Sequence, residues 1–369
     1  MGLTVLQEQG KGLGAAAVAE YRGAATAVRF TDPHMEFAAL RNGCGVYDLG
    51  YRAKISLSGG DRIRWLNGMV TNNVRDLQPG HGVYSFLLNP QGHILGDLYA
   101  YNRGDSITVG TDRSQVEKIL ATFDHYIIMD DVEVKNLSDE LTALGIAGPR
   151  SREVLAAAGI QVPEISPLEV IEAKCACDCD CISCTAVRGD DPTIEQYELW
   201  LPPTDVKKTW DALVQHGATP VGTEALELQR IFSGLPLYGV DIRERDLPQE
   251  TEQTRALNFN KGCYVGQEIV ERIRSRGAVH RKFSGFLSEH TIAPGAKIVV
   301  TDKEVGEITS AATFRNGEQE RTVALGYLRC EASVPGRELR IGMETGIVIQ
   351  LPLTDDALVR DVSLVRNSA

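Results

Sequence analysis

The first third of the chain alternates between two spacings of hydrophobic residues, one typical of strands and one typical of helices. In order, the pattern predicts a strand at 54–59, a helix at 61–70, strands at 83–89 and 94–102, a helix at 114–126 and a strand at 127–136. This strand, helix, strand, strand, helix, strand order is ferredoxin-like. We therefore expect residues 54–135 to form one compact unit.

The strand and helix pattern then recurs, and a different pattern follows it. Residues 142–160 predict a strand, a turn and a helix, and the strand at 197–203 is expected beside another within residues 181–190. Residues 204–217 predict a further helix. From Arg281 onward the helical period disappears, and short strands separated by turns predict a small barrel or sandwich.

Length and charge narrow the class of protein. A chain of 369 residues fits two or three domains, with 43% hydrophobic and 24% charged residues, as in ordinary globular proteins. The formal net charge of -12 argues against general binding to nucleic acid or to anionic membranes, because both require a cationic face. No secretory signal and no long apolar segment is evident, so we expect a cytoplasmic protein that does not interact with membranes.

Residues 261–277 (KGCYVGQEIVERIRSRG) contain the densest group of reactive and conformationally special residues. Their second half predicts a helix, which leaves Cys263 just before its N-terminus. Unpaired backbone N–H groups and the nearby Lys261 would both favour the thiolate there. The alternative is a small buried cysteine in a glycine-rich connection.

The motif K-G-C-Y-x-G-Q-E is present in full as Lys261, Gly262, Cys263, Tyr264, Gly266, Gln267 and Glu268. With it, the stretches CGVYDL, NPQGHILGDL, SGLPLYGVDI, VGEITSAA and ALGYL make the chain similar to the folate-binding YgfZ family, relatives of the glycine-cleavage T-protein. The resemblance implies an α+β clover-leaf: two ferredoxin-like α/β domains and a C-terminal β-barrel around a central folate pocket. The expected domains are 1–53 with 136–277, 54–135, and 281–369.

The resemblance also implies a function and a set of residues for it. It implies a tetrahydrofolate-binding accessory protein for iron-sulfur cluster assembly or repair, with iron-sulfur client proteins as partners. The alternative is an aminomethyltransferase or a folate-dependent demethylase. Whether the protein is an enzyme therefore stays open; if it is one, we expect a folate-dependent one-carbon transferase. Cys263, Lys261 and Asp97 are the candidate catalytic residues. The other motif residues expected to bind the cofactor are Gly262, Tyr264, Gly266 and Gln267.

Three residues outside the motif are expected to hold the folate. A carboxylate can accept hydrogen bonds from a pterin's N–H and amino groups, and Glu198 matches the T-protein position with that role. Arg230 aligns with a T-protein arginine near the cofactor, and Tyr84 resembles an aromatic of the pocket wall. Without the resemblance, these would be a solvated glutamate, an ion pair on a helix surface and a packed strand tyrosine.

Two departures from the T-protein pattern favour the YgfZ-like reading. The T-protein has two consecutive acids in the stretch ILGDL, whereas this chain has Gly96 followed by Asp97. Because an aspartate there steers protons at the reacting nitrogen, loss of one acid puts aminomethyl transfer in doubt. Residues 188–196 (RGDDPTIEQ) also replace the T-protein loop R-x-G-Y-T-G-E.

Five of the eight cysteines lie within residues 175–184 (CACDCDCISC). This is no spaced disulfide framework, so reduced thiols are expected. On a strand, alternate cysteines would share one face about 7 Å apart, too wide for one tetrahedral metal unless a turn at 178–180 brings them closer. A hairpin in which cysteine serves as a small apolar residue is the alternative, and whether a metal binds is left open.

Overall fold

The computed structural model describes residues 2–10, 13–175, 184–277, 279–316 and 319–353. The chain divides into two compact units. The first unit contains Met1–Leu87, Gly96–Leu226 and Asn260–Tyr264, and the second contains Leu88–Leu95, Glu227–Phe259 and Val265–Ala369. Each unit is therefore discontinuous in sequence.

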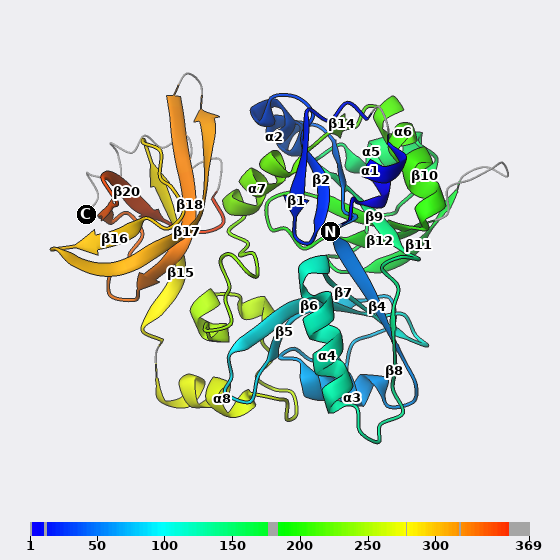
Figure 1. Ribbon diagram of the computed structural model, residues 1–369, viewed down its shortest axis with the longest axis horizontal. Coiled ribbons are helices and arrows are strands. Elements are labelled where there is room, and N and C mark those ends of the chain that lie inside the picture. Colours follow the sequence, from blue (N-terminus) through cyan, green and yellow to red (C-terminus); the bar gives the residue numbers. More distant parts are fainter. Residues whose placement is uncertain (1, 11–12, 176–183, 278, 317–318, 354–369) are drawn as a thin grey trace. The chain divides into compact units, whose positions relative to one another are not determined.

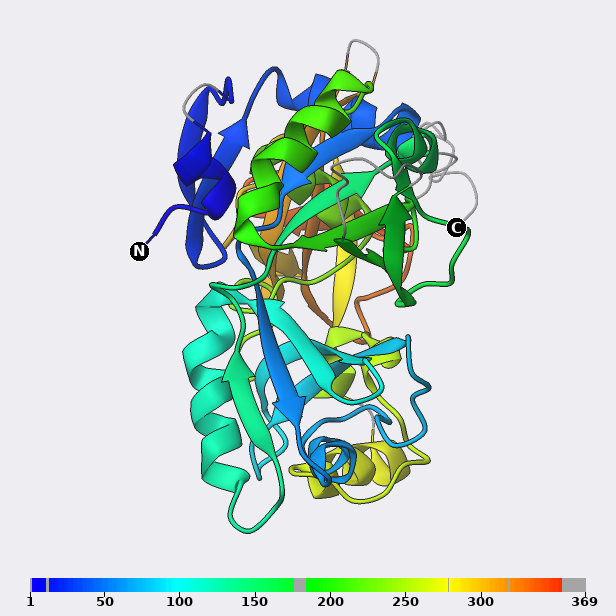
Figure 2. The ribbon, with the colours of Figure 1, turned by 90° about the vertical axis from the view of Figure 1, so that its right-hand side faces the viewer.

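A five-stranded sheet lies within residues 52–136. Its members are β4 (Arg52–Ser58), β5 (Gly82–Leu88), β6 (Ile94–Asn102), β7 (Ile107–Asp112) and β8 (Glu133–Asn136), in the spatial order β5-β6-β7-β4-β8. The helices α3 (Arg62–Met69) and α4 (Val116–Tyr126) follow β4 and β7 in sequence. Figure 2 shows α4 lying along one face of this sheet.

The strand β7 is absent from the order expected from sequence. It follows β6 after a short turn and pairs with both β6 and β4, so it is an interior strand. The expected helices and the strands β4, β5 and β6 are present, and the last strand is limited to β8. The apolar residues Ile128 and Met129, which the pattern placed in this strand, are exposed and lie before β8 in a bend outside the sheet.

The rest of the first unit is built on a seven-stranded sheet. Its members are β3 (Gly45–Asp48), β9 (Thr142–Ala147), β10 (Ile160–Gln161), β11 (Val170–Cys175), β12 (Cys184–Arg188), β13 (Gln196–Leu201) and β14 (Thr219–Pro220), in the order β10-β11-β12-β13-β9-β3-β14. Around it lie the hairpin β1 (Ala17–Tyr21) and β2 (Ala24–Arg29) and the helices α1 (Val5–Gln9), α2 (Pro33–Asn42), α5 (Ser151–Ala157) and α6 (Val206–Gln215). The expected neighbours β12 and β13 pair antiparallel.

Both faces of the seven-stranded sheet are buried, because alternate residues of β9 and β13 enter two different hydrophobic clusters. Leu144 and Leu199 belong to one cluster, and Ala143 and Trp200 to the other. Alternation with period two places these side chains on opposite faces. The indole of Trp200 is therefore on the same face of β13 as the side chain of Glu198.

The second unit contains a closed barrel of six strands, and Figure 1 shows its long strands β17 and β18. The strands are β15 (Arg281–Ser288), β16 (Lys297–Val300), β17 (Lys303–Asn316), β18 (Gln319–Arg329), β19 (Glu338–Ile341) and β20 (Glu344–Ile349). Phe286, Ile308 and Leu328 are buried in its core. The barrel and the mixed α/β sheets confirm the predicted fold class, whereas the expected domain boundaries stay predictions.

The helix α8 (Gln267–Arg276) directly follows a position that requires glycine. Gly266 has φ 81°, in the left-handed region that side chains rarely adopt. A Cβ at this position would also lie 2.5 Å from the backbone oxygen of Asn89. The glycine of the motif therefore lets the chain turn into α8 against the turn at Asn89 within the second unit.

We expect Gly266→Ala to destabilise the protein by about 2 kcal/mol, because it combines left-handed backbone strain with a backbone clash. Gly277→Ala is the matched control at the other end of α8, where φ is -154° and a Cβ would meet nothing within 4 Å. Urea unfolding of both variants measures the difference. Equal stability of the two variants would contradict the role given to Gly266.

Candidate functional site

One face of the five-stranded sheet is polar and aromatic, and the other packs on α4. A Cβ at Gly96 would lie 3.0 Å from Oε1 of Gln115 and 3.7 Å from a side-chain carbon of Ile119, which belongs to α4. Asp97 is the next residue of β6, so its side chain points to the opposite face. Tyr99 and Tyr101 share this face of β6 with Asp97.

This orientation changes what the glycine at position 96, in place of an acid, implies for the chemistry of the site. The acid that the T-protein pattern would place at position 96 would face Gln115 and α4, whereas the acid retained at position 97 faces the polar and aromatic side. The departure at Gly96 therefore removes no charge from the polar and aromatic face. The glycine at position 96 is therefore no argument against aminomethyl transfer, contrary to the expectation from sequence.

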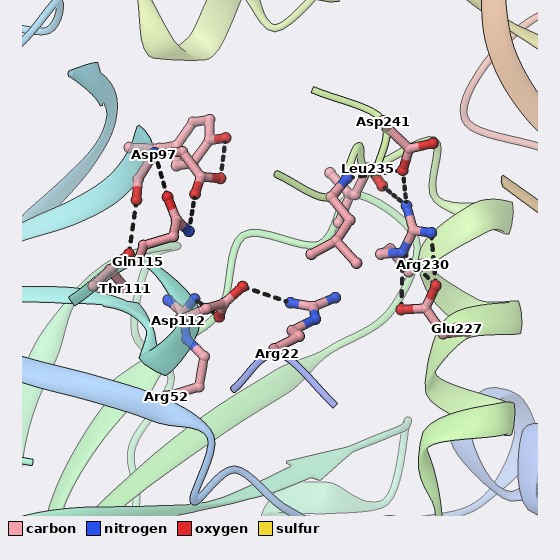
Figure 3. A network of polar contacts seen from close by, with 12 residues as sticks. Arg22, Arg52, Asp97, Thr111, Asp112, Gln115, Glu227, Arg230, Leu235 and Asp241 are labelled. Atoms are coloured by element: carbon pink, nitrogen blue, oxygen red, sulfur yellow. Dashed lines mark hydrogen bonds and ion pairs between the residues drawn. The ribbon is translucent and has the colours of Figure 1, made fainter. Parts of the chain in front are cut away.

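Asp97 is held by hydrogen bonds on both of its carboxyl oxygens, as Figure 3 shows. The hydroxyl of Tyr84 donates to Oδ2 at 2.7 Å, and the side-chain amide of Gln115 donates to Oδ1 at 2.8 Å. Burial, followed by the negative charge of Asp112, raises the pKa of Asp97 despite these two donors. A carboxyl group with a raised pKa can hold a proton and deliver it.

An ion-pair network on the same face joins Asp112 to Glu198 through Arg52. Arg52 donates from Nη1 to Oδ1 of Asp112 at 2.7 Å, and its Nε lies 3.7 Å from Oε1 of Glu198. Arg22 approaches the other oxygen of Asp112 at 3.6 Å (Figure 3). The positive charge of Arg52 also acts on Asp97, where it lowers the pKa. Three carboxylates and two guanidinium groups thus share one region of the first unit.

Glu198 accepts hydrogen bonds from two neighbours. The indole N–H of Trp200 donates to Oε2 at 2.8 Å, and Nζ of Lys54, a residue with no exposed surface, lies 3.4 Å from the same oxygen. Burial acts to raise the pKa of Glu198, but Lys54 and Arg52 outweigh it and lower the pKa. Burial also lowers the pKa of Lys54 more than Glu198 raises it. Because two cations and an indole N–H surround the carboxylate, the site favours ionised Glu198.

Aromatic rings line this face in a row. The ring centroids of Tyr84 and Tyr99 lie 4.9 Å apart, Tyr99 and Tyr101 are stacked at 6.1 Å, and Tyr101 meets Trp200 edge-on at 5.2 Å. The hydroxyl of Tyr99 donates to Asp190 at 3.1 Å. Stacking surfaces beside fixed carboxylates are what a flat, polar-edged heterocycle requires. The side chains present therefore fit a pterin.

The motif residues 261–264 belong to the first unit, and Lys261 anchors them. Its Nζ donates to the backbone oxygens of Asn67, Val70 and Asn72 at 2.5, 2.5 and 2.8 Å. Burial and then Arg75 lower the pKa of Lys261 to about 7, but three carbonyl acceptors require three N–H donors, which only the ammonium form has. The Nζ atom of Lys261 also lies 4.9 Å from the ring centroid of Tyr264, which is buried.

Cys263 is exposed, between residues that are held in place. Its neighbour Gly262 is also exposed, and a Cβ on Gly262 would approach Arg75 at 3.4 Å. Cys263 therefore lies at a surface that reagents can reach, which disfavours the alternative of a small buried cysteine. Lys261 supports the loop through its carbonyl contacts, so its expected catalytic role stays a prediction.

Arg230 belongs to the second unit, and its guanidinium group is fully hydrogen-bonded. It lies in α7 (Thr223–Phe232), is 7% exposed, and binds Glu227, Asp241 and the backbone oxygen of Leu235 (Figure 3). It also binds the hydroxyl of Ser310. All these partners belong to the second unit. Cofactor binding by Arg230 stays a prediction, as it does for Gly266 and Gln267 at the start of α8.

The structure thus brings together three of the predicted residues, Tyr84, Asp97 and Glu198. Sequence reasoning missed the side chains that surround them: Arg52, Lys54, Tyr99, Tyr101, Asp112, Gln115 and Trp200. The signal was present, because charged residues in β4 and aromatic residues in β6 alternate with buried apolar ones. A strand with charged or aromatic residues at every second position can present them to a functional site as well as to solvent.

The cysteine run falls mostly on residues 176–183, which lie outside the described residues. Among the described residues, no group of three or more His, Cys, Asp or Glu side chains is placed to hold a metal ion. In that same part of the chain, no helix combines the length and apolarity needed to cross a bilayer.

Comparison with known proteins gives one consistent family. Residues 7–261 match the family model described as the GCVT N-terminal domain. The chain is 28% identical to an aminomethyltransferase of Halothermothrix orenii over 95% of this chain and 99% of that protein. It is 26% identical to a chloroplastic putative transferase of Arabidopsis thaliana, covering 85% of this chain and 72% of that protein.

A solved structure is similar over nearly the whole chain. The glycine cleavage system aminomethyltransferase T of Bartonella henselae superimposes with a TM-score of 0.85 at 21% identity, covering 96% of this chain and 98% of that one. At this identity the likeness shows the fold. The predicted T-protein-like fold is therefore confirmed.

We expect Glu198→Gln to destabilise the protein at neutral pH by about 1 to 3 kcal/mol, because it leaves the buried Lys54 without its counter-charge. The folded pKa of Glu198 is lowered, so its stabilising effect is present above the unfolded pKa of about 4.3 and is lost as pH falls through the folded pKa. Urea unfolding of the wild type and of Glu198→Gln, from neutral pH to below the folded pKa, measures the difference in free energy of unfolding. This difference should become smaller towards acid pH.

Lys54→Met provides the control for this expectation. In the Glu198→Gln background it removes the uncompensated cation, so the double variant should regain part of the lost stability. A double variant less stable than Glu198→Gln alone would contradict the ion pair as the cause.

Proposed function

The chain belongs to the GCVT family, and from this premise we propose that it is a tetrahydrofolate-dependent one-carbon transferase of the aminomethyltransferase type. The observation that carries the proposal is the polar and aromatic face of the first unit. There a protonatable Asp97 and an ionised Glu198 flank a row of tyrosines. The relatives named as aminomethyltransferases support the same class of reaction.

Each residue of this face has a part in the proposed binding. Glu198 accepts the N–H groups along the polar edge of the pterin, since its charged form is the one that Lys54 and Arg52 favour. Tyr99, which is partly exposed and stacked against the buried Tyr101, provides a flat surface for stacking. When bound, the reduced folate supplies the nitrogens that receive the one-carbon unit.

Asp97 handles the proton in the proposed reaction. In the transfer, the carbon of the aminomethyl donor would form bonds to two folate nitrogens, which lose their protons, while its bonds to the carrier sulfur and to the amino nitrogen break and release a thiol and ammonia. The leaving nitrogen needs a proton, and a carboxyl group with a raised pKa can donate it. Tyr84 and Gln115 position Asp97 through their hydrogen bonds to its two oxygens. These two residues act through the aspartate and are positioning residues.

We expect Asp97→Asn to lower methylene-folate formation from an aminomethyl-loaded lipoyl carrier by about 10²- to 10⁴-fold, because the proton donor is lost. Tetrahydrofolate affinity, measured by calorimetry, should change by less than about threefold, since the asparagine side chain keeps the shape of the aspartate it replaces. Turnover assays and titrations on the same preparations separate the two effects.

The control is Asp105→Asn, an exposed aspartate in the turn between β6 and β7. It should behave as wild type in both measurements. Wild-type protein that gives no heat with tetrahydrofolate would remove the proposal altogether, and an active Asp97→Asn would remove the role of the aspartate.

A second candidate function is favoured by the exposure of Cys263. In it, the chain is a folate-binding accessory protein of the YgfZ type for iron-sulfur cluster assembly or repair, with Cys263 as its essential sulfur. The loop supports this reading because Lys261 and Tyr264 hold the exposed thiol between them in a fixed place. The client would be an iron-sulfur protein.

We expect a maleimide to modify Cys263 before Cys44 and Cys184 in the native protein. Burial raises the pKa of Cys44 to about 11 and that of Cys184 to about 12, and both residues are 3% exposed. Peptide mapping after brief labelling measures the order. Labelling of Cys44 or Cys184 ahead of Cys263 would contradict the assigned exposure.

Cys263→Ala then separates the two candidate functions. Unchanged methylene-folate formation by this variant supports the transferase. Lost maturation of an iron-sulfur enzyme in cells that depend on this protein, with folate binding unchanged, supports the accessory role.

A further inference from the structure

The second unit contains a cavity that the proposed function does not use. It has a volume of about 450 Å³, within the range of small-molecule sites in proteins. Its lining comes from the strands β16, β17 and β18, the first residue of β15, and the segment around Asp246. All of these residues belong to the second unit, so the cavity is complete within it.

The cavity is cationic. Five basic and three acidic side chains line it: Arg243, Arg245, Arg281, Lys297 and Arg329, with Asp246, Glu304 and Glu307. Low-dielectric walls of one dominant sign concentrate counter-ions of the other sign. The charge balance therefore favours an anionic ligand.

Several of these charged side chains form ion pairs with one another in the wall of the cavity. Arg281 binds Asp246 at 2.7 Å and Glu250 at 2.9 Å, and Arg243 lies 2.9 Å from Glu307. Lys297 contacts Glu304 and Glu307 at 2.9 and 3.0 Å. These close pairs hold the lining side chains in place.

Three other donors in the lining have no hydrogen bond among the described residues. Arg245 approaches Asp246 only at 3.9 Å, and Arg329 approaches Glu331 only at 3.9 Å. The hydroxyl of Tyr327, a residue 5% exposed, is buried without a hydrogen-bond partner in the part of the chain that the structure describes. Tyr327 and Arg329 lie two residues apart on β18 and so share one face of it.

An unpartnered buried hydroxyl costs free energy, so its retention calls for a partner that the protein does not supply. Burial, followed by the charge of Asp246, raises the pKa of Tyr327, which keeps the hydroxyl protonated and able to donate at neutral pH. Guanidinium groups match carboxylate and phosphate oxygens in geometry and charge. All three donors therefore fit oxyanion groups.

We propose that this cavity is a second ligand site, which binds a small organic anion with two negative charges through Arg245, Tyr327 and Arg329. A dicarboxylate and a phosphate monoester both have this chemistry. The site lies outside the polar and aromatic face assigned to folate and goes beyond the proposed function. Binding of the dianion therefore requires no folate.

Calorimetric titrations at constant ionic strength test the proposal with succinate and with glycerol 3-phosphate as probes. The uncharged diamide of succinate is the control ligand. We expect saturable binding of at least one dianion and none of the diamide, and the two arms decide between carboxylate and phosphate. No binding of either dianion, or equal binding of the diamide, would overturn the proposal.

Three variants locate the site. Arg245→Gln and Arg329→Gln should each weaken binding about tenfold or more, and Tyr327→Phe about three- to tenfold, since charged hydrogen bonds are the stronger ones. Arg315→Gln is the matched control, because this exposed arginine of β17 has one ion pair at 3.6 Å and lies outside the lining. An Arg315→Gln variant as weak as Arg329→Gln would show nonspecific charge effects and refute the site.

The outcome is separable from that of the proposed function. Arg245 and Arg329 are 62% and 60% exposed in their side chains, so their variants are expected to fold. A tetrahydrofolate titration of Arg329→Gln should match wild type. Failure of folate binding in the wild type would leave the dianion result intact.

Discussion

The ion pair between Lys54 and Glu198 is the interaction on which the candidate site depends. A charged lysine without exposed surface is costly unless a carboxylate compensates it, and here that carboxylate comes from a strand of the other sheet of the same unit. The pair therefore links the five-stranded and seven-stranded sheets electrostatically. It also favours the ionised form of Glu198, in which both oxygens accept hydrogen bonds and neither donates.

The hydrophobic pattern predicted the elements well and their partners poorly. The barrel, the helix after Gly266 and most strands follow from spacing, because alternation with a period of two or 3.6 residues is local information. The strand β7 was not assigned although it is an interior strand of its sheet. The contacts of Arg52 with Asp112 and of Lys54 with Glu198 span 60 and 144 residues, and no local pattern encodes such pairings.

Residue roles read from a motif depend on which face a strand presents. Resemblance singled out Gly96 as a lost acid, but strand geometry turns position 96 toward α4 and leaves Asp97 on the polar and aromatic face. In the same way, Lys261 suggested catalysis from its place beside Cys263, whereas its ammonium is engaged by three backbone oxygens. Each case needed a neighbour that lies far away in the sequence.

The anchoring of Lys261 has a consequence for biosynthesis. The carbonyl groups that it binds, at the end of α3 and just beyond, are translated almost 200 residues earlier, and residues 260–264 complete the first unit only after the chain has passed into the second. Domains usually fold in the order in which they leave the ribosome. Here the contacts of Lys261 form last, so the carbonyl oxygens beyond α3 are left to water until the segment that carries Cys263 has emerged.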